Sequence, residues 1–374
     1  MFLTPLSEDS LSNLQKYKYK YSTESTIFND ISSPLLSRLA KIIPTNVSPI
    51  SLTLTGFFLT VIAGVVSFFD GGFDFTHELK RSTCFIIGLC QFLYYILDNL
   101  DEFQAKRTNK VTAFGKLLDH SCDVFTTIIT AFNLSKMFAL GNNDYFSFTV
   151  FLCLYIGFYM MTFEEFKVGE MHFPEYSGAD EGNLTVAGLG FLLSYTGQGW
   201  IKHIFFTNTT VTVGRLFGWF MAVFSVKYIY CCYSNTYDKR SPKECGKNVF
   251  ENAPFYSVIL VPLYFTEYFP VFYKNYRWLI LVNSSLIFAR VTIDVEVKIV
   301  TMDIPKGCLM FWVSNLAFIF SFFAYFDWLR YYVLIGLMIV QSLELILFIF
   351  VRLREITKFV NSKKFEKEGD AVNV

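Results

Sequence analysis

The chain has 374 residues and carries 32 Lys and Arg against 32 Asp and Glu, so its formal net charge is zero. Charged residues make up 17 % of it, whereas an ordinary soluble domain has about 25 %, and 53 % are hydrophobic and 19 % aromatic. This composition argues against a soluble enzyme, and it excludes a disordered or nucleic-acid-binding chain, which needs more charge or a basic excess. We therefore expect an all-α, polytopic integral membrane protein.

Hydrophobic stretches near 20 residues, the length that a helix needs to cross about 30 Å of hydrocarbon, recur along the chain. We predict ten transmembrane helices, at 50–69, 82–100, 116–140, 145–163, 184–200, 211–232, 253–273, 278–298, 308–326 and 331–351. The weakest are 184–200, which has a Gly-rich end, and 278–298, which carries Arg290, Asp294 and Glu296. Nine spans is the alternative count.

Residues 31–43, before the first predicted span, have apolar positions at helical spacing with Arg38 and Lys41 between them. This pattern predicts an interfacial amino-terminal helix, although an ordinary connecting helix fits equally well. The segment before it lacks the charged and apolar regions of a cleavable signal peptide, so we expect none.

The basic residues predict the orientation. With both termini in the cytosol, 22 of the 32 Lys and Arg residues lie in cytosolic segments and 8 on the opposite side, as the positive-inside rule requires. The eight cysteines form no C-x-x-C pair, so zinc and disulfide sites are poorly supported. Cys231 and Cys232, at a cytosolic helix end, are candidates for palmitoylation, but we favour buried apolar roles for them.

Four carboxylates follow one another across the second and third predicted spans. Asp98 and Asp101 are three residues apart, and Asp119 and Asp123 are four apart, so each pair lies on one helical face. Two antiparallel helices joined by a short loop can therefore direct all four carboxylates to one point near the membrane surface. Ionisable groups inside membrane spans usually face a cavity and indicate function.

Divalent metal is the natural compensation for four carboxylates, because Mg²⁺ and Mn²⁺ prefer carboxylate and phosphate oxygen. Two such ions would polarise a bound diphosphate for in-line attack. The structural alternative is that some of the aspartates cap helices or pair with Lys106, Arg107 or Lys116. His120, beside Asp119, fits a catalytic role and a supporting or packing role equally well.

These residues resemble the signature of the CDP-alcohol phosphotransferases, which has four Asp, one Ala and one Gly at fixed spacing. The matching positions are Asp98, Asp101, Ala105, Gly115, Asp119 and Asp123. Segments 14–25, 48–56, 163–173 and 177–182 are similar to the choline/ethanolamine branch of that family.

The resemblance implies a division of the chain into four parts. Residues 1–48 are expected to form a cytosolic segment with the interfacial helix, 49–232 the catalytic helices, 233–352 the carboxy-terminal transmembrane helices and 353–374 a cytosolic tail. It also implies an endoplasmic reticulum or Golgi membrane, an active site that faces the cytosol, and a homodimer.

The resemblance further implies a reaction in phospholipid biosynthesis. Asp98, Asp101, Asp119 and Asp123 would hold two Mg²⁺ or Mn²⁺ ions on the diphosphate of CDP-ethanolamine or CDP-choline. The hydroxyl of diacylglycerol, or of a related lipid alcohol, would attack the β-phosphorus and release CMP. Asp123 is similar to the residue usually assigned as general base, and His120 or Glu164 could share that duty. Ala105, Lys106, Arg107 and Gly115 fall on the nucleotide-binding part of the signature.

Three positions depart from the family pattern. Glu102 replaces a Gly that lets the nucleotide approach the backbone, and it adds bulk and negative charge. Lys106 replaces an Arg and loses its two-point contact with phosphate, for which Arg107 could compensate. Ile50 replaces an Asn and removes a polar group. These departures favour, as the alternative, a non-catalytic membrane relative that binds nucleotide or partners.

Two further classes are less well supported. Intramembrane prenyltransferases also bind diphosphate through acidic helices, but their two acidic motifs lie far apart in sequence, and here one loop separates them. A transporter is expected to show an internal repeat, and we find none in the sequence.

Overall fold

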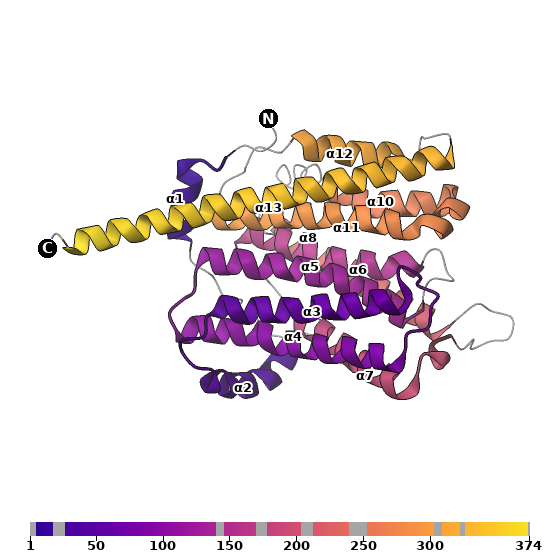
Figure 1. The fold of residues 1–374 in the computed structure, drawn as a ribbon, viewed down its shortest axis with the longest axis horizontal. Coiled ribbons are helices and arrows are strands. Elements are labelled where there is room, and N and C mark those ends of the chain that lie inside the picture. Colours follow the sequence, from indigo (N-terminus) through magenta and orange to yellow (C-terminus); the bar gives the residue numbers. More distant parts are fainter. Residues whose placement is uncertain are drawn as a thin grey trace.

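The computed structural model describes residues 5–17, 27–139, 146–169, 178–202, 212–238, 253–302, 309–321 and 326–372. Long helices run side by side along one direction (Figure 1). Each of the ten predicted spans corresponds to one of them. They are α3 (Pro49–Gly71), α4 (Arg81–Arg107), α5 (Ala113–Met137), α6 (Phe146–Val168), α7 (Ala179–Thr196), α8 (Val213–Asp238), α10 (Ala253–Tyr268), α11 (Pro270–Thr301), α12 (Leu309–Phe320) and α13 (Asp327–Val372).

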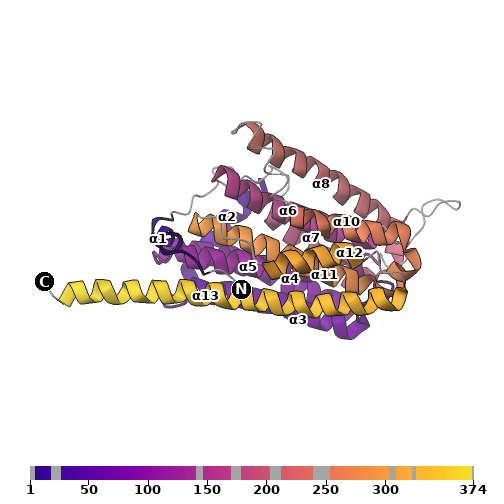
Figure 2. The ribbon, with the colours of Figure 1, turned by 90° about the horizontal axis from the view of Figure 1, so that it is seen from above.

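Five of these helices, α3, α4, α6, α11 and α13, are long and apolar enough to cross a membrane by length and composition. The prediction of an all-α polytopic membrane protein is confirmed. The bundle also carries a short 3₁₀ helix, η2 (Gly199–Lys202), after α7. Helix α13 continues well past the predicted span end at 351 and projects beyond the bundle (Figures 1 and 2).

One predicted boundary is wrong. We placed a connection between 273 and 278, where Lys274 and Arg277 make the sequence polar, but α10 ends at Tyr268 and α11 begins at Pro270. Proline lacks a backbone N–H and suits the first position of a new helix, so it sets the boundary. The polar residues lie inside α11, where non-helical dihedral angles at Tyr276 (φ −126°, ψ 21°) mark a kink.

Two short helices, α1 (Glu8–Lys16) and α2 (Ile27–Ile42), lie near the end of the bundle at which α4 passes into α5 (Figure 1). Helix α2 overlaps the predicted interfacial helix at 31–43 and packs against α4 and α7. Its Leu36 and Ala40 are buried, whereas Ile31, Leu35 and Ile42 are exposed. An exposed apolar stripe on a polar helix is what a helix at a membrane surface needs.

Close backbone contact brings α7 against α4. A Cβ atom added at Gly190 would lie 2.6 Å from Gly88 Cα, and one added at Gly88 would lie 2.9 Å from the Ala187 carbonyl oxygen. Small residues at helix crossings allow this approach in membrane proteins. The pair of glycines therefore fixes how closely the amino-terminal end of α7 approaches the acidic residues of α4.

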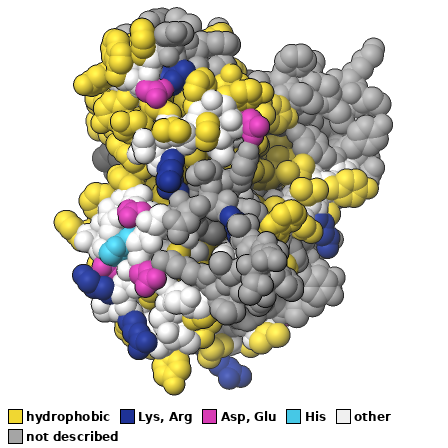
Figure 3. Space-filling model, turned by 90° about the vertical axis from the view of Figure 1, so that its right-hand side faces the viewer, with side chains coloured by type: hydrophobic (Ala, Val, Ile, Leu, Met, Phe, Trp, Pro, Cys, Tyr) yellow, Lys and Arg dark blue, Asp and Glu magenta, His cyan; other side chains and the backbone are white. Residues whose placement is uncertain are grey.

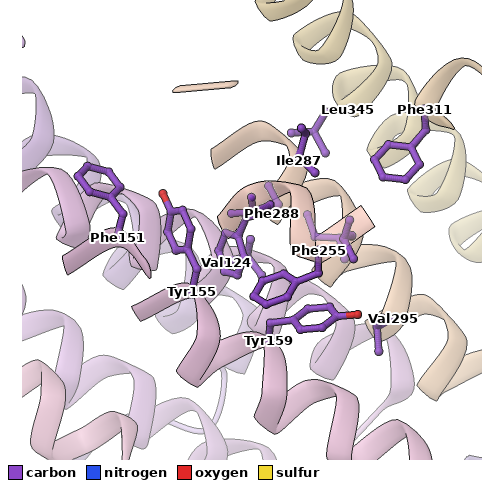
Figure 4. Packing of buried hydrophobic residues seen from close by; sticks show 14 of the residues in the cluster. Val124, Phe151, Tyr155, Tyr159, Phe255, Ile287, Phe288, Val295, Phe311 and Leu345 are labelled. Atoms are coloured by element: carbon purple, nitrogen blue, oxygen red, sulfur yellow. The ribbon is translucent and has the colours of Figure 1, made fainter. Parts of the chain in front are cut away.

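Aromatic stacking joins the carboxy-terminal helices to the amino-terminal ones (Figure 4). Tyr155 of α6 stacks on Phe288 of α11 with ring centroids 4.1 Å apart, and Tyr159 stacks on Phe255 of α10 at 3.9 Å. Val124 of α5 belongs to the same buried cluster. This packing holds α11 beside α5 and α6, so side chains of α11 can reach the face of α5 that carries the acidic motif.

The opposite end of the bundle shows charged side chains among apolar ones (Figure 3). Here Lys80 and His77, which lead into α4, pair with Asp70 near the end of α3 at 3.2 and 3.7 Å. The buried Lys136 ammonium donates to the carbonyl oxygens of Ser67 and Gly72. The charged side chains at this end therefore pair with one another or bind backbone carbonyl groups near the end of α3.

Candidate active site

Three carboxylates of the acidic motif converge at the end of the bundle where α4 passes into α5. One ligand oxygen each from Asp98, Asp119 and Asp123 lies within 4.8 Å of the others. Asp101, 6 % exposed, accepts a hydrogen bond from the Thr53 hydroxyl of α3, and its charge interacts with those of Asp98 and Asp119. The structure therefore brings the four residues of the two motif halves into one acidic cluster.

Within the part of the chain that the structure describes, no Lys or Arg forms an ion pair with these four aspartates. Asp119 Oδ1 is shut off from solvent and accepts no hydrogen bond there. Asp123 Oδ1 accepts one from the Tyr94 hydroxyl at 2.5 Å. Converging carboxylates of this kind fit the donor set that Mg²⁺ or Mn²⁺ prefers.

A second buried group lies beside the first. His120 Nδ1 is 2.9 Å from Glu296 Oε1 of α11, and Glu165 of α6 belongs to the same group of ligand atoms within 4.8 Å. Glu165 pairs with the buried Lys116 ammonium. Because Lys116 lies in this group, its charges are partly compensated within the protein, whereas no described lysine or arginine pairs with the aspartates.

Tyr17, the residue that follows α1, lies against this second group. The Lys116 ammonium lies 5.7 Å from the centre of the Tyr17 ring. Burial raises the pKa of the Tyr17 phenol, so the ring stays neutral beside the lysine. Residues 18–25 and 170–177, on which part of the family resemblance rests, lie outside the described residues.

The candidate Glu164 is buried, but it is Glu165, one position further on, that joins the group around His120. Sequence reasoning also missed Tyr94, Thr53 and Glu296. No pattern marked Thr53 or Tyr94. Glu296 did carry a signal, a carboxylate within a predicted apolar span, but nothing in the sequence indicated its partner.

Two of the three departures from the motif, Glu102 and Lys106, lie on an exposed side of α4. Glu102 Oε1 and Lys106 Nζ form an ion pair at 2.9 Å, with side chains 44 % and 42 % exposed. Arg107 donates to the Ile43 carbonyl oxygen and to Gln104 Oε1, which ties the α2–α3 connection to α4. Ile50 is half-buried in the first turn of α3. Two of the three departures therefore neutralise each other.

The two small motif residues shape the link between α4 and α5. Gly115 lies in the first turn of α5, where its backbone N–H donates to Thr112 Oγ1 at 3.0 Å and a Cβ atom would lie 3.2 Å from that oxygen. The Ala105 carbonyl oxygen accepts from Lys110 N at 2.9 Å as α4 ends. Both positions hold the short connection that places Asp98 opposite Asp123.

A cavity of about 440 Å³ opens from Asp98 and Asp123 into the bundle. Threonines of α5 and the first turn of α7 line its polar part, and aliphatic and aromatic side chains of α5, α6 and α8 line the rest. Its walls include Thr126, Thr130, Glu181, Phe158, Met161 and Phe217. A mostly apolar chamber with a few polar groups at one end fits a ligand that has a polar head and an apolar body.

Comparison with known proteins agrees with this geometry. Residues 46–224 match the family model described as CDP-alcohol phosphatidyltransferase. The choline/ethanolaminephosphotransferase 1 of Saccharomyces cerevisiae is 30 % identical over 210 residues, which cover 55 % of this chain and 52 % of that protein. The ethanolaminephosphotransferase 1 of Homo sapiens is 24 % identical over 210 residues, covering 54 % and 52 %.

An uncharacterised class-I family protein of Schizosaccharomyces pombe is 32 % identical over 204 residues, covering 53 % of this chain and 51 % of that protein. Residues 46–224 are therefore similar to a CDP-alcohol phosphatidyltransferase domain over that part of the chain. The chain spans about half the length of the first curated relatives it matches.

Proposed function

We propose that the protein transfers phosphoethanolamine or phosphocholine from CDP-ethanolamine or CDP-choline to the hydroxyl of diacylglycerol, or of a related lipid alcohol, and releases CMP. The observation that carries this proposal is the convergence of Asp98, Asp119 and Asp123, with no Lys or Arg paired to them among the described residues, at the mouth of an apolar cavity. The matches to two phosphotransferases named for choline and ethanolamine support the donor class.

The aspartates would hold two Mg²⁺ or Mn²⁺ ions. When bound, such ions neutralise the diphosphate and stabilise the departing phosphate of CMP. The protein fixes the ligands before the donor arrives, because Thr53 orients Asp101 and Tyr94 orients Asp123. Rigid ligands of this kind position the diphosphate for in-line attack.

The apolar cavity would take the body of the lipid alcohol and bring its hydroxyl to the acidic end. In the transfer, the hydroxyl oxygen bonds to the β-phosphorus, the bond from that phosphorus to the bridging oxygen breaks, and CMP leaves with the bridging oxygen. The hydroxyl proton passes to Asp123, with His120 as the second proton acceptor. Both residues lie on α5, three positions apart, so they are neighbours on the surface of that helix.

We place this activity in an endoplasmic reticulum or Golgi membrane, with the acidic cluster facing the cytosol. The excess of Lys and Arg in the segments on that side of the membrane supports the orientation. A homodimer is the assembly expected for the family, and the light scattering of the purified protein tests it.

The decisive experiment offers CDP-choline and CDP-ethanolamine, with diacylglycerol and Mg²⁺ or Mn²⁺, to the purified protein in lipid nanodiscs and measures CMP. We expect metal-dependent CMP release with at least one donor and none from Asp123→Ala. Folded, metal-loaded protein that releases no CMP with either donor and several lipid alcohols would overturn the proposal.

The second candidate, a non-catalytic relative, is favoured by Glu102, Lys106 and Ile50 at motif positions. It predicts that the wild-type protein binds a CDP-alcohol without releasing CMP. Calorimetric titration of the same preparation with CDP-ethanolamine separates the two candidates, because only the enzyme converts the bound donor.

A further inference from the structure

The most completely buried carboxylate near the acidic cluster comes from a helix outside the residues that match the family model. Glu296 of α11 has no exposed surface, and residue 296 lies well beyond the matching region 46–224. Its Oε1 atom is 2.9 Å from Nδ1 of His120, a residue 176 positions earlier in the chain. His120 follows Asp119 directly and points toward α11.

The contact with Glu296 determines which nitrogen of the His120 ring carries a hydrogen. An ionised carboxylate only accepts hydrogen bonds, so the hydrogen of the contact sits on His120 Nδ1. In a neutral ring, Nε2 then carries the free lone pair. Histidine rings in catalytic and metal sites are commonly oriented in this way, by a carboxylate that accepts the hydrogen of the other ring nitrogen.

The surroundings keep Glu296 in place as an anion. Lys116 of α5 contributes a positive charge that interacts with Glu296, and Glu165 of α6 holds that lysine by an ion pair. The neutral Tyr17, beyond α1, covers the group from the side. The second oxygen of Glu296 is buried and accepts no hydrogen bond within the described structure. The Oε1 atom makes the contact with His120, and Thr162 of α6 is a further polar neighbour of the carboxylate.

We propose that Glu296 is a positioning residue, which holds His120 with Nε2 free to accept the proton of the attacking lipid hydroxyl. The proposal rests on the proposed function, because His120 is the second proton acceptor of that same reaction. It makes the carboxy-terminal helices part of the active site and assigns a task to α11 that residues 46–224 cannot perform alone.

The kinetic test compares Glu296→Ala, His120→Ala and the double variant in the CMP-release assay. We expect Glu296→Ala to lower kcat by roughly 100-fold, in the range seen when a supporting carboxylate is lost, with an unchanged KM for the CDP-alcohol. Because Glu296 acts through His120, the double variant should be no slower than His120→Ala alone. Losses that multiply in the double variant would overturn the proposal, as would a wild-type kcat in Glu296→Ala.

Two further variants separate positioning from folding. Glu296→Gln keeps an oxygen that can accept the Nδ1 hydrogen, so it should restore most of the lost kcat. Glu344→Gln removes another buried carboxylate, 4 % exposed, which pairs with Arg290 and not with a site residue. We expect it to leave the kcat of the folded protein unchanged. A purely structural role for Glu296 predicts similar behaviour of Glu344→Gln and Glu296→Ala.

A measurement without turnover keeps this proposal separate from the proposed function. In ¹⁵N-histidine spectra at a pH where the ring is neutral, His120 should carry its hydrogen on Nδ1 in the wild type and move toward the Nε2–H form in Glu296→Ala. An unchanged tautomer would overturn the positioning role even if the wild type releases CMP. If the expected tautomer shift occurs in a protein without turnover, only the proposed function fails.

Discussion

Two buried groups of charged side chains in this molecule differ in how their charge is balanced. In the carboxy-terminal half, Arg290 of α11 pairs with Glu344 of α13 at 3.0 Å and with Asp294 at 3.2 Å, and its guanidinium lies 3.5 Å from the centre of the Phe348 ring. Lys298 adds a second cation for Asp294 at 2.8 Å. In the acidic cluster of α4 and α5, no described residue supplies a cation to the aspartates.

The difference teaches that acidic residues in a membrane protein indicate function only after their partners are known. Removing a charge from water is costly, and a paired, hydrogen-bonded ion offsets most of that cost. The Arg290 network meets this condition and joins two helices. No residue that the structure describes meets this condition for the aspartates, and they are the residues to which the proposed function gives the metal.

The largest effect is expected from Asp119→Ala. The substitution removes a carboxylate from the converging set, and we expect CMP release to fall by roughly 10³-fold or more, as when a group that stabilises transition-state charge is lost. Millimolar Mg²⁺ should stabilise the wild type against heat, by about 2.7 kcal/mol at one hundred times the dissociation constant. The variant should lose most of this stabilisation.

The matched control is Asp294→Asn, which changes a carboxylate of the balanced network and should leave the metal response intact. Asp119→Ala should be at least as stable as the wild type without metal, since it relieves repulsion among like charges. Wild-type turnover in Asp119→Ala, or an unchanged response to Mg²⁺, would contradict the assignment of the metal site.

The next effect concerns stability and comes from Arg290→Met. Loss of the guanidinium leaves Glu344 buried without its cation, and breaking a buried pair in this way costs about 3–5 kcal/mol. We expect a large fall in thermal stability, while the folded fraction keeps its kcat. Adding Glu344→Gln should recover part of the loss, because it removes the unbalanced charge. A fall in kcat without a fall in stability would show that the network belongs to the site.

Helical periodicity explains how much of this arrangement could be predicted. The spacing of Asp98 with Asp101, and of Asp119 with Asp123, fixes which side chains share a face, and one short connection makes the two helices neighbours. Span positions follow from hydropathy for the same local reason. The boundary between α10 and α11 is also determined locally, by Pro270. The prediction instead places it at the charged residues Lys274 and Arg277.

Contacts between distant segments could not be predicted. Nothing local brings Glu296 to His120, because that contact depends on how α11 packs on α5 and α6 through stacked rings such as Tyr155 and Phe288. The choice between Glu164 and Glu165 fails for a related reason. Neighbouring residues on a helix point about 100° apart, so only the packing of α6 decides which one meets Lys116.

The smallest effect is expected at Glu102 and Lys106, two of the departures from the family motif. Their charges balance each other at the protein surface. Glu102 holds Lys106 in a half-exposed ion pair, which is worth about 0.2–1 kcal/mol. Glu102→Gln removes this ion pair and one negative charge beside the acidic cluster, so the KM for the CDP-alcohol should fall by about two- to fivefold at unchanged kcat and stability. Lys106→Gln should raise the same KM. A higher KM in Glu102→Gln would instead show that Glu102 itself contacts the donor. The motif of this chain would then bind the donor through a side chain that the family pattern lacks.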